Sequence, residues 1–200
     1  MELTLITAYI AFAFVSSITP GPNNLLLMAS GTNYGFTRSL PHLMGVSLGF
    51  TLMICLVGVG LIEIFDAYPL SYTVLKMFSV VYLVYLAWKI ATAESATGNS
   101  NGKAAGSPMT FLQAAAFQWV NPKAWAMALT AISVYAVTED KFIGVLVIAL
   151  MFCAVNLPSC GCWVVLGTQL RRLLTNPVRL RVFNITCSVL LLASLYPILF

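Results

Sequence analysis

Two prolines interrupt an otherwise apolar stretch near the N-terminus, in the segment 19–24 with the sequence TPGPNN. Proline has no backbone N–H, and its ring clashes with the carbonyl group four residues earlier. Pro20 and Pro22 therefore deprive the carbonyls of Ser16 and Ile18 of their helical partners. An unpaired carbonyl in hydrocarbon costs several kcal/mol, so such a break persists only against protein or in a water-filled cavity.

The residues that follow this break can bind a ligand. Gly21 lets the backbone turn, and Pro22 suits the first position of a helix that restarts there. The free N–H groups at that helix start favour an anion such as a carboxylate, while Asn23 and Asn24 add amide donors and acceptors. Broken helices of this kind bind substrates in membrane transporters. The segment predicts a binding site, with a purely structural kink as the alternative.

A second break is predicted at Asn121, Pro122 and Lys123. Pro122 removes the hydrogen bond to the Gln118 carbonyl, and Asn121 can cap the restarted helix. Lys123 is the most deeply placed charge, because residues 104–122 and 124–138 carry none. An intramembrane lysine costs from about 2.5 kcal/mol upward unless it is paired or hydrated. With no acidic residue at comparable depth, its partners are backbone carbonyls, water or a substrate carboxylate, unless the side chain reaches an interface.

Three further features are weaker signals. His42 is a candidate for proton coupling, with an interfacial hydrogen-bonding role as the alternative. Asn156 in a later apolar run faces the cavity or bonds a neighbouring helix. Gly45 and Gly49 form a GxxxG motif, which predicts close internal helix packing and, as a second option, a homodimer face.

Composition places these features in a polytopic membrane protein. Hydrophobic residues make up 60% of the 200 residues and charged residues 8%, and the mean hydropathy is +0.93. A soluble domain cannot bury so much apolar surface, and disorder requires the opposite composition. The net charge of +4 includes four arginines between Arg171 and Arg181, a cluster typical of a membrane surface, and no nucleic-acid partner is predicted.

The chain is not predicted to be an enzyme. It contains no HExxH, GxSxG or phosphate-loop motif, and its one histidine excludes a multi-histidine metal site. No metal or cofactor is expected. The five cysteines form no CxxC pair and lie in apolar runs, so they are predicted to be small core residues rather than a disulfide framework.

The predicted fold class is all-α, with six transmembrane helices in one domain, residues 1–200. The spans are expected near 4–28, 41–62, 70–91, 110–135, 142–168 and 182–200. A flexible linker, 93–108, separates the halves 1–92 and 109–200. Three spans in each half predict a 3+3 inverted repeat whose first and fourth helices are broken by proline.

Loop charges predict the orientation. The loops after spans one, three and five carry seven basic residues: Arg38, Lys89, Lys103, Arg171, Arg172, Arg179 and Arg181. The positive-inside rule places these loops in the cytoplasm and both termini outside.

The ordered motifs resemble those of the LysE/RhtB family of amino-acid exporters. The match rests on TPGPNN at 19–24, Gly35-Phe36, GVSLGF at 45–50, YLAWK at 85–89 and QWVNPK at 118–123. AWKIAT at 87–92, Asn156 and Cys162-Trp163 are most similar to the cysteine/O-acetylserine exporters. The resemblance implies a carrier in the bacterial inner membrane that moves small amino acids outward. The positions implied by the motifs and the resemblance are Pro20, Gly21, Pro22, Asn23, Asn24, Asn121, Pro122, Lys123 and Asn156.

The leading hypothesis is thus a secondary exporter that works by alternating access, with the proton gradient as its energy source. A membrane thiol-electron conduit is the first alternative, but it needs a cysteine in each broken span, and neither contains one. A structural membrane subunit is the second. It predicts that Lys123 and the prolines can change without loss of transport.

Overall fold

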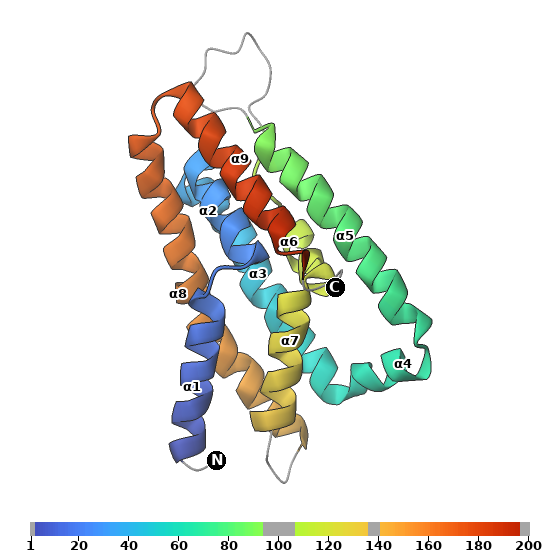
Figure 1. Ribbon diagram of the computed structural model, residues 1–200. Helices are drawn as coiled ribbons and strands as arrows, with labels where there is room; N and C mark the ends of the chain where they lie inside the picture. The colour runs from blue at the N-terminus through green and yellow to red at the C-terminus, as the bar shows by residue number, and fades with distance from the viewer. Residues whose placement is uncertain (1–2, 94–106, 136–140, 197–200) are drawn as a thin grey trace.

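A computed structural model describes residues 3–93, 107–135 and 141–196, and helices account for nearly all of them, with no strand in those ranges (Figure 1). Most of the predicted linker 93–108 lies outside the described residues. The elements in the first half are α1 (Leu3–Ile18), α2 (Pro22–Tyr34), α3 (Phe36–Leu56), the π-helical turn η1 (Val57–Leu61), α4 (Ile62–Ala67) and α5 (Leu70–Ala91). Those in the second half are α6 (Phe111–Phe117), the 3-10 turn η2 (Gln118–Val120), α7 (Pro122–Thr130), the π-helical turn η3 (Ala131–Tyr135), α8 (Lys141–Leu173) and α9 (Pro177–Ala193).

Three helical segments in the described ranges are long and apolar enough to cross a membrane: Phe36–Leu61, Leu70–Ala91 and Phe142–Leu173. The bent pair α1 and α2 is a fourth candidate, with 55° between its two helices. The all-α membrane class is thus confirmed, whereas the six-span 3+3 repeat stays a prediction. The two predicted breaks are present, since helix stops before Pro22 and again at Asn121.

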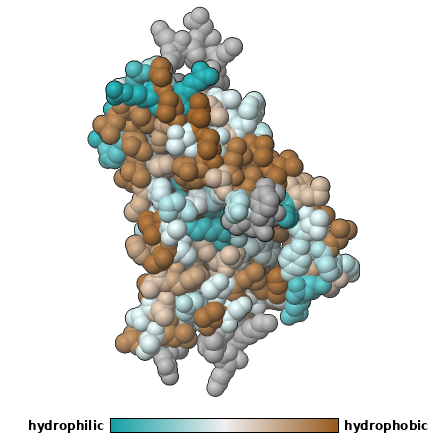
Figure 2. Space-filling model, viewed as in Figure 1, coloured by the Kyte–Doolittle hydropathy of each residue, from teal (hydrophilic) through white to brown (hydrophobic). Residues whose placement is uncertain are grey.

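The outer surface is apolar, as a lipid-facing surface must be. Figure 2 shows hydrophobic side chains over much of the visible face, with hydrophilic ones gathered where α8 meets α9 and at mid-height beside α1 and α7. Helix α5 has a row of exposed apolar side chains that includes Met77, Val81 and Trp88.

Two separate apolar clusters form the interior. The α9-side cluster joins α2, α3, α5, α6, α8 and α9, and its fully buried members include Leu27, Leu83, Phe117, Val164 and Leu191. The α1-side cluster joins α1, α3, α7 and α8, and its fully buried members include Tyr9, Met53, Ile54, Ile148 and Phe152. Helices α3 and α8 run through both clusters. The two helix breaks lie at the level where one cluster gives way to the other (Figure 1).

Glycines set the close packing of α2 against α8. A side chain on Gly31 would collide with the carbonyl of Val164, and one on Gly167 would collide with the carbonyl of Met28. The Thr32 hydroxyl donates a hydrogen bond to the Gly167 carbonyl at 3.0 Å. Small residues permit this approach of two backbones inside a membrane.

The GxxxG motif packs inside the protein, as predicted. A Cβ on Gly45 would meet the Phe111 carbonyl and the side chain of Ala114 in α6, and one on Gly49 would meet Ala115. Gly35, at φ 82°, makes the tight turn between α2 and α3 that only glycine adopts readily. These contacts fix α3 against both α2 and α6. The homodimer stays a prediction.

We predict that Gly167→Ala lowers the melting temperature in detergent. The added methyl group would have to push α8 away from the Met28 carbonyl, and overpacking of this kind costs about 1–3 kcal/mol. The matched control is Gly161→Ala on the same helix, where a Cβ meets only Leu43 at 3.8 Å. Equal melting temperatures for the two variants would contradict the packing described for α2 and α8.

Candidate functional site

The break between α1 and α2 is stabilised by side chains that bond its freed carbonyls. The indole N–H of Trp163 donates to the Ile18 carbonyl at 3.1 Å. The Asn24 amide donates to the carbonyls of Ser17 and Thr19, at 2.8 and 2.9 Å. Of the two carbonyls predicted to lose their helical partners, that of Ile18 has a replacement donor from α8, and the carbonyls of Ser17 and Thr19 have one from α2.

Gly21 precedes the restarted helix in an extended conformation, and no side chain caps the start of α2. A Cβ at this position would lie 2.8 Å from Cδ and 3.2 Å from Nζ of Lys123. The glycine therefore leaves room for the lysine side chain to reach the break.

The second break follows the 3-10 turn η2. Asn121 is buried, and its side-chain oxygen accepts a hydrogen bond from the backbone N–H of Lys123 at 3.2 Å, as the predicted cap requires. Gln118 connects this break to the first, because its amide exchanges two hydrogen bonds with the Asn23 amide, at 2.8 and 3.1 Å. The two breaks, far apart in the sequence, therefore share one polar layer.

Lys123 joins the breaks directly. Its ammonium donates a 2.6 Å hydrogen bond to the Thr19 carbonyl, across the boundary between the two halves of the chain. The ammonium is thus bonded inside the protein, to a carbonyl that the proline break has freed. A cation held by a neutral dipole is a ready partner for an anion, because a charge-assisted bond to a carboxylate is stronger.

Asn156 completes the polar layer from α8 and shows both predicted behaviours. Its amide donates to the Ser17 hydroxyl at 3.0 Å, and its oxygen accepts from the Ser47 hydroxyl at 3.1 Å. It also lines the central cavity. The thiol of Cys160, one turn later, donates to the Asn24 oxygen at 3.5 Å.

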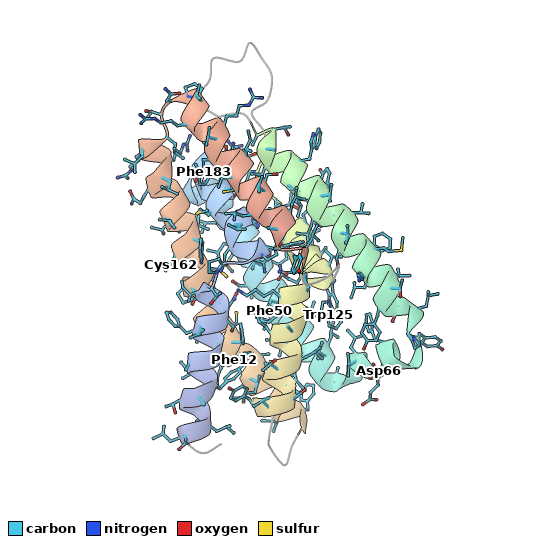
Figure 3. All side chains as sticks on the ribbon, in the orientation of Figure 1. Phe12, Phe50, Asp66, Trp125, Cys162 and Phe183 are labelled. Carbon is cyan, nitrogen blue, oxygen red and sulfur yellow. The ribbon has the colours of Figure 1, made fainter. Side chains whose placement is uncertain are left out.

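These groups line an open cavity, which we call the central cavity; its empty space of about 330 Å³ includes a part that is open to solvent. Six predicted site residues line it: Gly21, Asn23, Asn24, Asn121, Lys123 and Asn156. Its lining contains no acidic residue among those described. Phe50 closes the cavity on the side of the α1-side cluster and packs against Phe152 with 4.8 Å between ring centroids (Figure 3).

The three predicted prolines do not line the cavity. Pro22 is buried, whereas Pro20 is exposed, and both act through the backbone breaks they cause. Pro122 likewise begins α7 without contributing to the lining. Their contribution is therefore to shape the cavity rather than to contact a ligand.

His42 does not belong to the central cavity. The side chain is 1% exposed, and neither ring nitrogen has a hydrogen-bond partner. The expectation of an interfacial hydrogen-bonding role is therefore wrong, because the packing of α3 against its neighbours encloses the ring. It lines a second cavity, closer to the start of α3.

Sequence reasoning missed several residues of the site. Ser16, Ser17 and Cys160 line the cavity, and Gln118 and Trp163 bond its framework. Ser17 lies three residues before Pro20, close to the predicted helix break, and this position could have indicated that it belongs to the site. Trp163 was indicated only by the resemblance of Cys162-Trp163 to the cysteine/O-acetylserine exporters. All five cysteines are free, so no disulfide supports a thiol-electron pathway.

We predict that Trp163→Phe destabilises the protein by about 1–3 kcal/mol, since it leaves the half-buried Ile18 carbonyl without its donor. Unfolding by denaturant in micelles measures the change. Trp88→Phe serves as the control, because Trp88 is 63% exposed on α5. A Trp163→Phe protein as stable as the control would show that the indole bond does not support the break.

Comparison with known proteins agrees with this architecture. The LysE type translocator family matches residues 14–194. A cysteine/O-acetylserine efflux protein of Klebsiella pneumoniae is 33% identical over 178 residues, which cover 86% of this chain and 87% of that protein. Two Escherichia coli proteins of the same name, from strains O139:H28 and K12, are each 30% identical. The alignment with the O139:H28 protein covers 96% of both chains. The alignment with the K12 protein covers 86% of this chain and 87% of that protein.

No solved structure matches the chain. The family match nevertheless includes both helix breaks, the half-buried Lys123 and the Asn156 of α8. It extends over far more than half of the sequence, and the efflux proteins are similar over most of their length. The chain therefore belongs to the family of LysE type translocators, which are membrane transporters.

Proposed function

We propose that this protein exports a small amino acid of the cysteine or O-acetylserine type across the bacterial inner membrane. One observation carries the proposal: the Lys123 ammonium, from one broken helix, is held 2.6 Å from the carbonyl that the other break has freed. Both groups border the central cavity, or bond residues that line it. The names of the relatives, cysteine/O-acetylserine efflux protein, support the substrate class.

A zwitterionic amino acid can replace the internal bond without changing the charge of the site. Its carboxylate takes the Lys123 ammonium, and its ammonium group takes the Thr19 carbonyl that the lysine leaves. The uncapped start of α2, with the positive end of the helix dipole, adds N–H donors to the carboxylate. The side-chain oxygens of Asn23 and Asn24 can accept from the amino group.

The proposed mechanism is alternating access by a six-span protein whose halves form an inverted repeat. The apolar clusters on the two sides of the polar layer would then separate in turn. A bond that can be exchanged with substrate, such as that between Lys123 and Thr19, lets the two broken helices part when substrate is bound. The basic loops face the cytoplasm and both termini face outward in this proposal. Coupling to protons through His42 remains a prediction.

We predict that Lys123→Gln lowers efflux at least tenfold at equal membrane abundance, because a charge-assisted hydrogen bond contributes about 1.5–3 kcal/mol. Cells are loaded with amino acids by dipeptide feeding, and mass spectrometry follows each amino acid in the medium. Lys76→Gln is the matched control, since Lys76 is exposed on α5.

Two outcomes would count against the proposal. If no amino acid leaves the cells faster than from cells with an empty vector, the export function fails. If export is present but Lys123→Gln matches the Lys76→Gln control, the site assignment fails while the transport function stands.

A further inference from the structure

His42 is a buried polar side chain whose two ring nitrogens are unpaired. The ring is 1% exposed, and neither Nδ1 nor Nε2 has a hydrogen-bond partner among the described residues. Burial of such a group without a partner costs about 1–3 kcal/mol. An unsatisfied group of this kind in a folded protein requires an explanation, and an absent ligand is one.

The ring borders an open cavity between α2, α3 and α5, which we call the His42 cavity; its empty space of about 380 Å³ includes a part that is open to solvent. Its polar lining consists of Ser30, Asn33 and Tyr34 from α2, His42 from α3, Lys89 from α5, and Ser107. No acidic residue is among the described residues that line it. Lys89 therefore contributes a positive charge to the described part of the lining.

Most of the neighbouring polar groups already have partners inside the protein. The hydroxyls of Ser30 and Ser39 are 2.7 Å apart in one hydrogen bond. The Asn33 amide donates to the Asn184 oxygen at 2.9 Å and to the Ala29 carbonyl. The imidazole is thus the buried side chain of this lining whose nitrogens have no partner among the described residues, and it shares the cavity with the Lys89 ammonium.

The His42 cavity and the central cavity lie along the same two helix faces. On α2, Asn23 lines the central cavity, and Leu26 and Ser30 line the His42 cavity, at the i, i+3, i+7 spacing of one face. On α3, His42 lies one turn before Val46, which lines the central cavity. Seven residues of helix separate Asn23 from Ser30, a rise of about 10 Å.

We infer that the His42 cavity is a second binding site for the carboxylate of the transported amino acid, on the cytoplasmic side of the central cavity. This inference rests on the proposed function and on its orientation. An imidazole N–H together with an ammonium group matches the two oxygens of a carboxylate. The apolar side chains of Leu26 and Val46 lie between the two sites, so a substrate would pass them to reach Lys123.

The chain offers a direct probe, because His42 is its one histidine. Protein labelled with [15N]histidine in micelles gives imidazole signals from this residue alone. L-O-acetylserine is titrated into the millimolar range at constant pH. Parallel titrations use its methyl ester, which lacks the carboxylate, and inorganic phosphate, which tests whether the cavity takes anions in general.

We expect a saturable shift of the imidazole signals with O-acetylserine and none with the methyl ester. The shift persists in Lys123→Gln, because the central cavity is not needed for it. In Lys89→Gln the apparent affinity falls roughly tenfold, as expected for loss of a charged partner, and Lys89→Arg restores most of it. Lys76→Gln on the same helix behaves as wild type.

The inference is overturned if O-acetylserine leaves the imidazole signals unchanged, or if the methyl ester shifts them equally. It is also overturned if the shift is lost in Lys123→Gln but kept in Lys89→Gln. A phosphate shift as strong as that of O-acetylserine would overturn the assignment to the amino acid in favour of a general anion site. Failure of the proposed function is seen separately, as efflux that does not depend on Lys123 while the imidazole shift remains.

Discussion

A backbone carbonyl in an apolar environment must find a hydrogen-bond donor, and the arrangement of this protein follows from that constraint. Prolines free several carbonyls in the middle of an apolar stretch. The donors that replace the lost backbone bonds are Asn24 of α2, directly after the break, and two residues of distant helices, Lys123 of α7 and Trp163 of α8. Each bond ties a separate helix to the break, and together they assemble a polar layer between two apolar clusters.

The same constraint explains how the layer would bind a ligand under the proposed function. Backbone carbonyls that accept hydrogen bonds from side chains, rather than from the N–H groups of a continuous helix, can exchange those donors for atoms of a substrate. The carboxylate of an amino acid can replace the Thr19 carbonyl at Lys123, and its ammonium group can replace Lys123 at Thr19. Helices α3 and α8 belong to both apolar clusters, so they connect the parts that would move.

Effects that depend on sequence neighbours predicted much of the site. The hydrogen bonds between residues far apart in the sequence could not be predicted in this way. Pro22 and Pro122 each begin a helix, and Asn121 caps one, because these effects depend on neighbours within four residues. The pairing of Asn23 with Gln118 joins residues 95 apart, and that of Trp163 with Ile18 joins residues 145 apart. Such pairs follow from how the helices pack. The same holds for His42, whose position near the start of a span suggested an interface, although α2 and α5 enclose it.

The central claim is that Lys123 binds the substrate carboxylate, and solid-state NMR can test it directly. Lys76, Lys89, Lys103 and Lys141 are replaced by arginine, so that Lys123 is the one lysine left. Rotational-echo double resonance then reports dipolar coupling between [ε-15N]lysine and [1-13C]O-acetylserine in membranes. The account predicts strong dephasing of the carboxylate signal, because the two atoms lie within hydrogen-bonding distance. Bound substrate without dephasing would contradict it, since the carboxylate would then lie away from the only lysine.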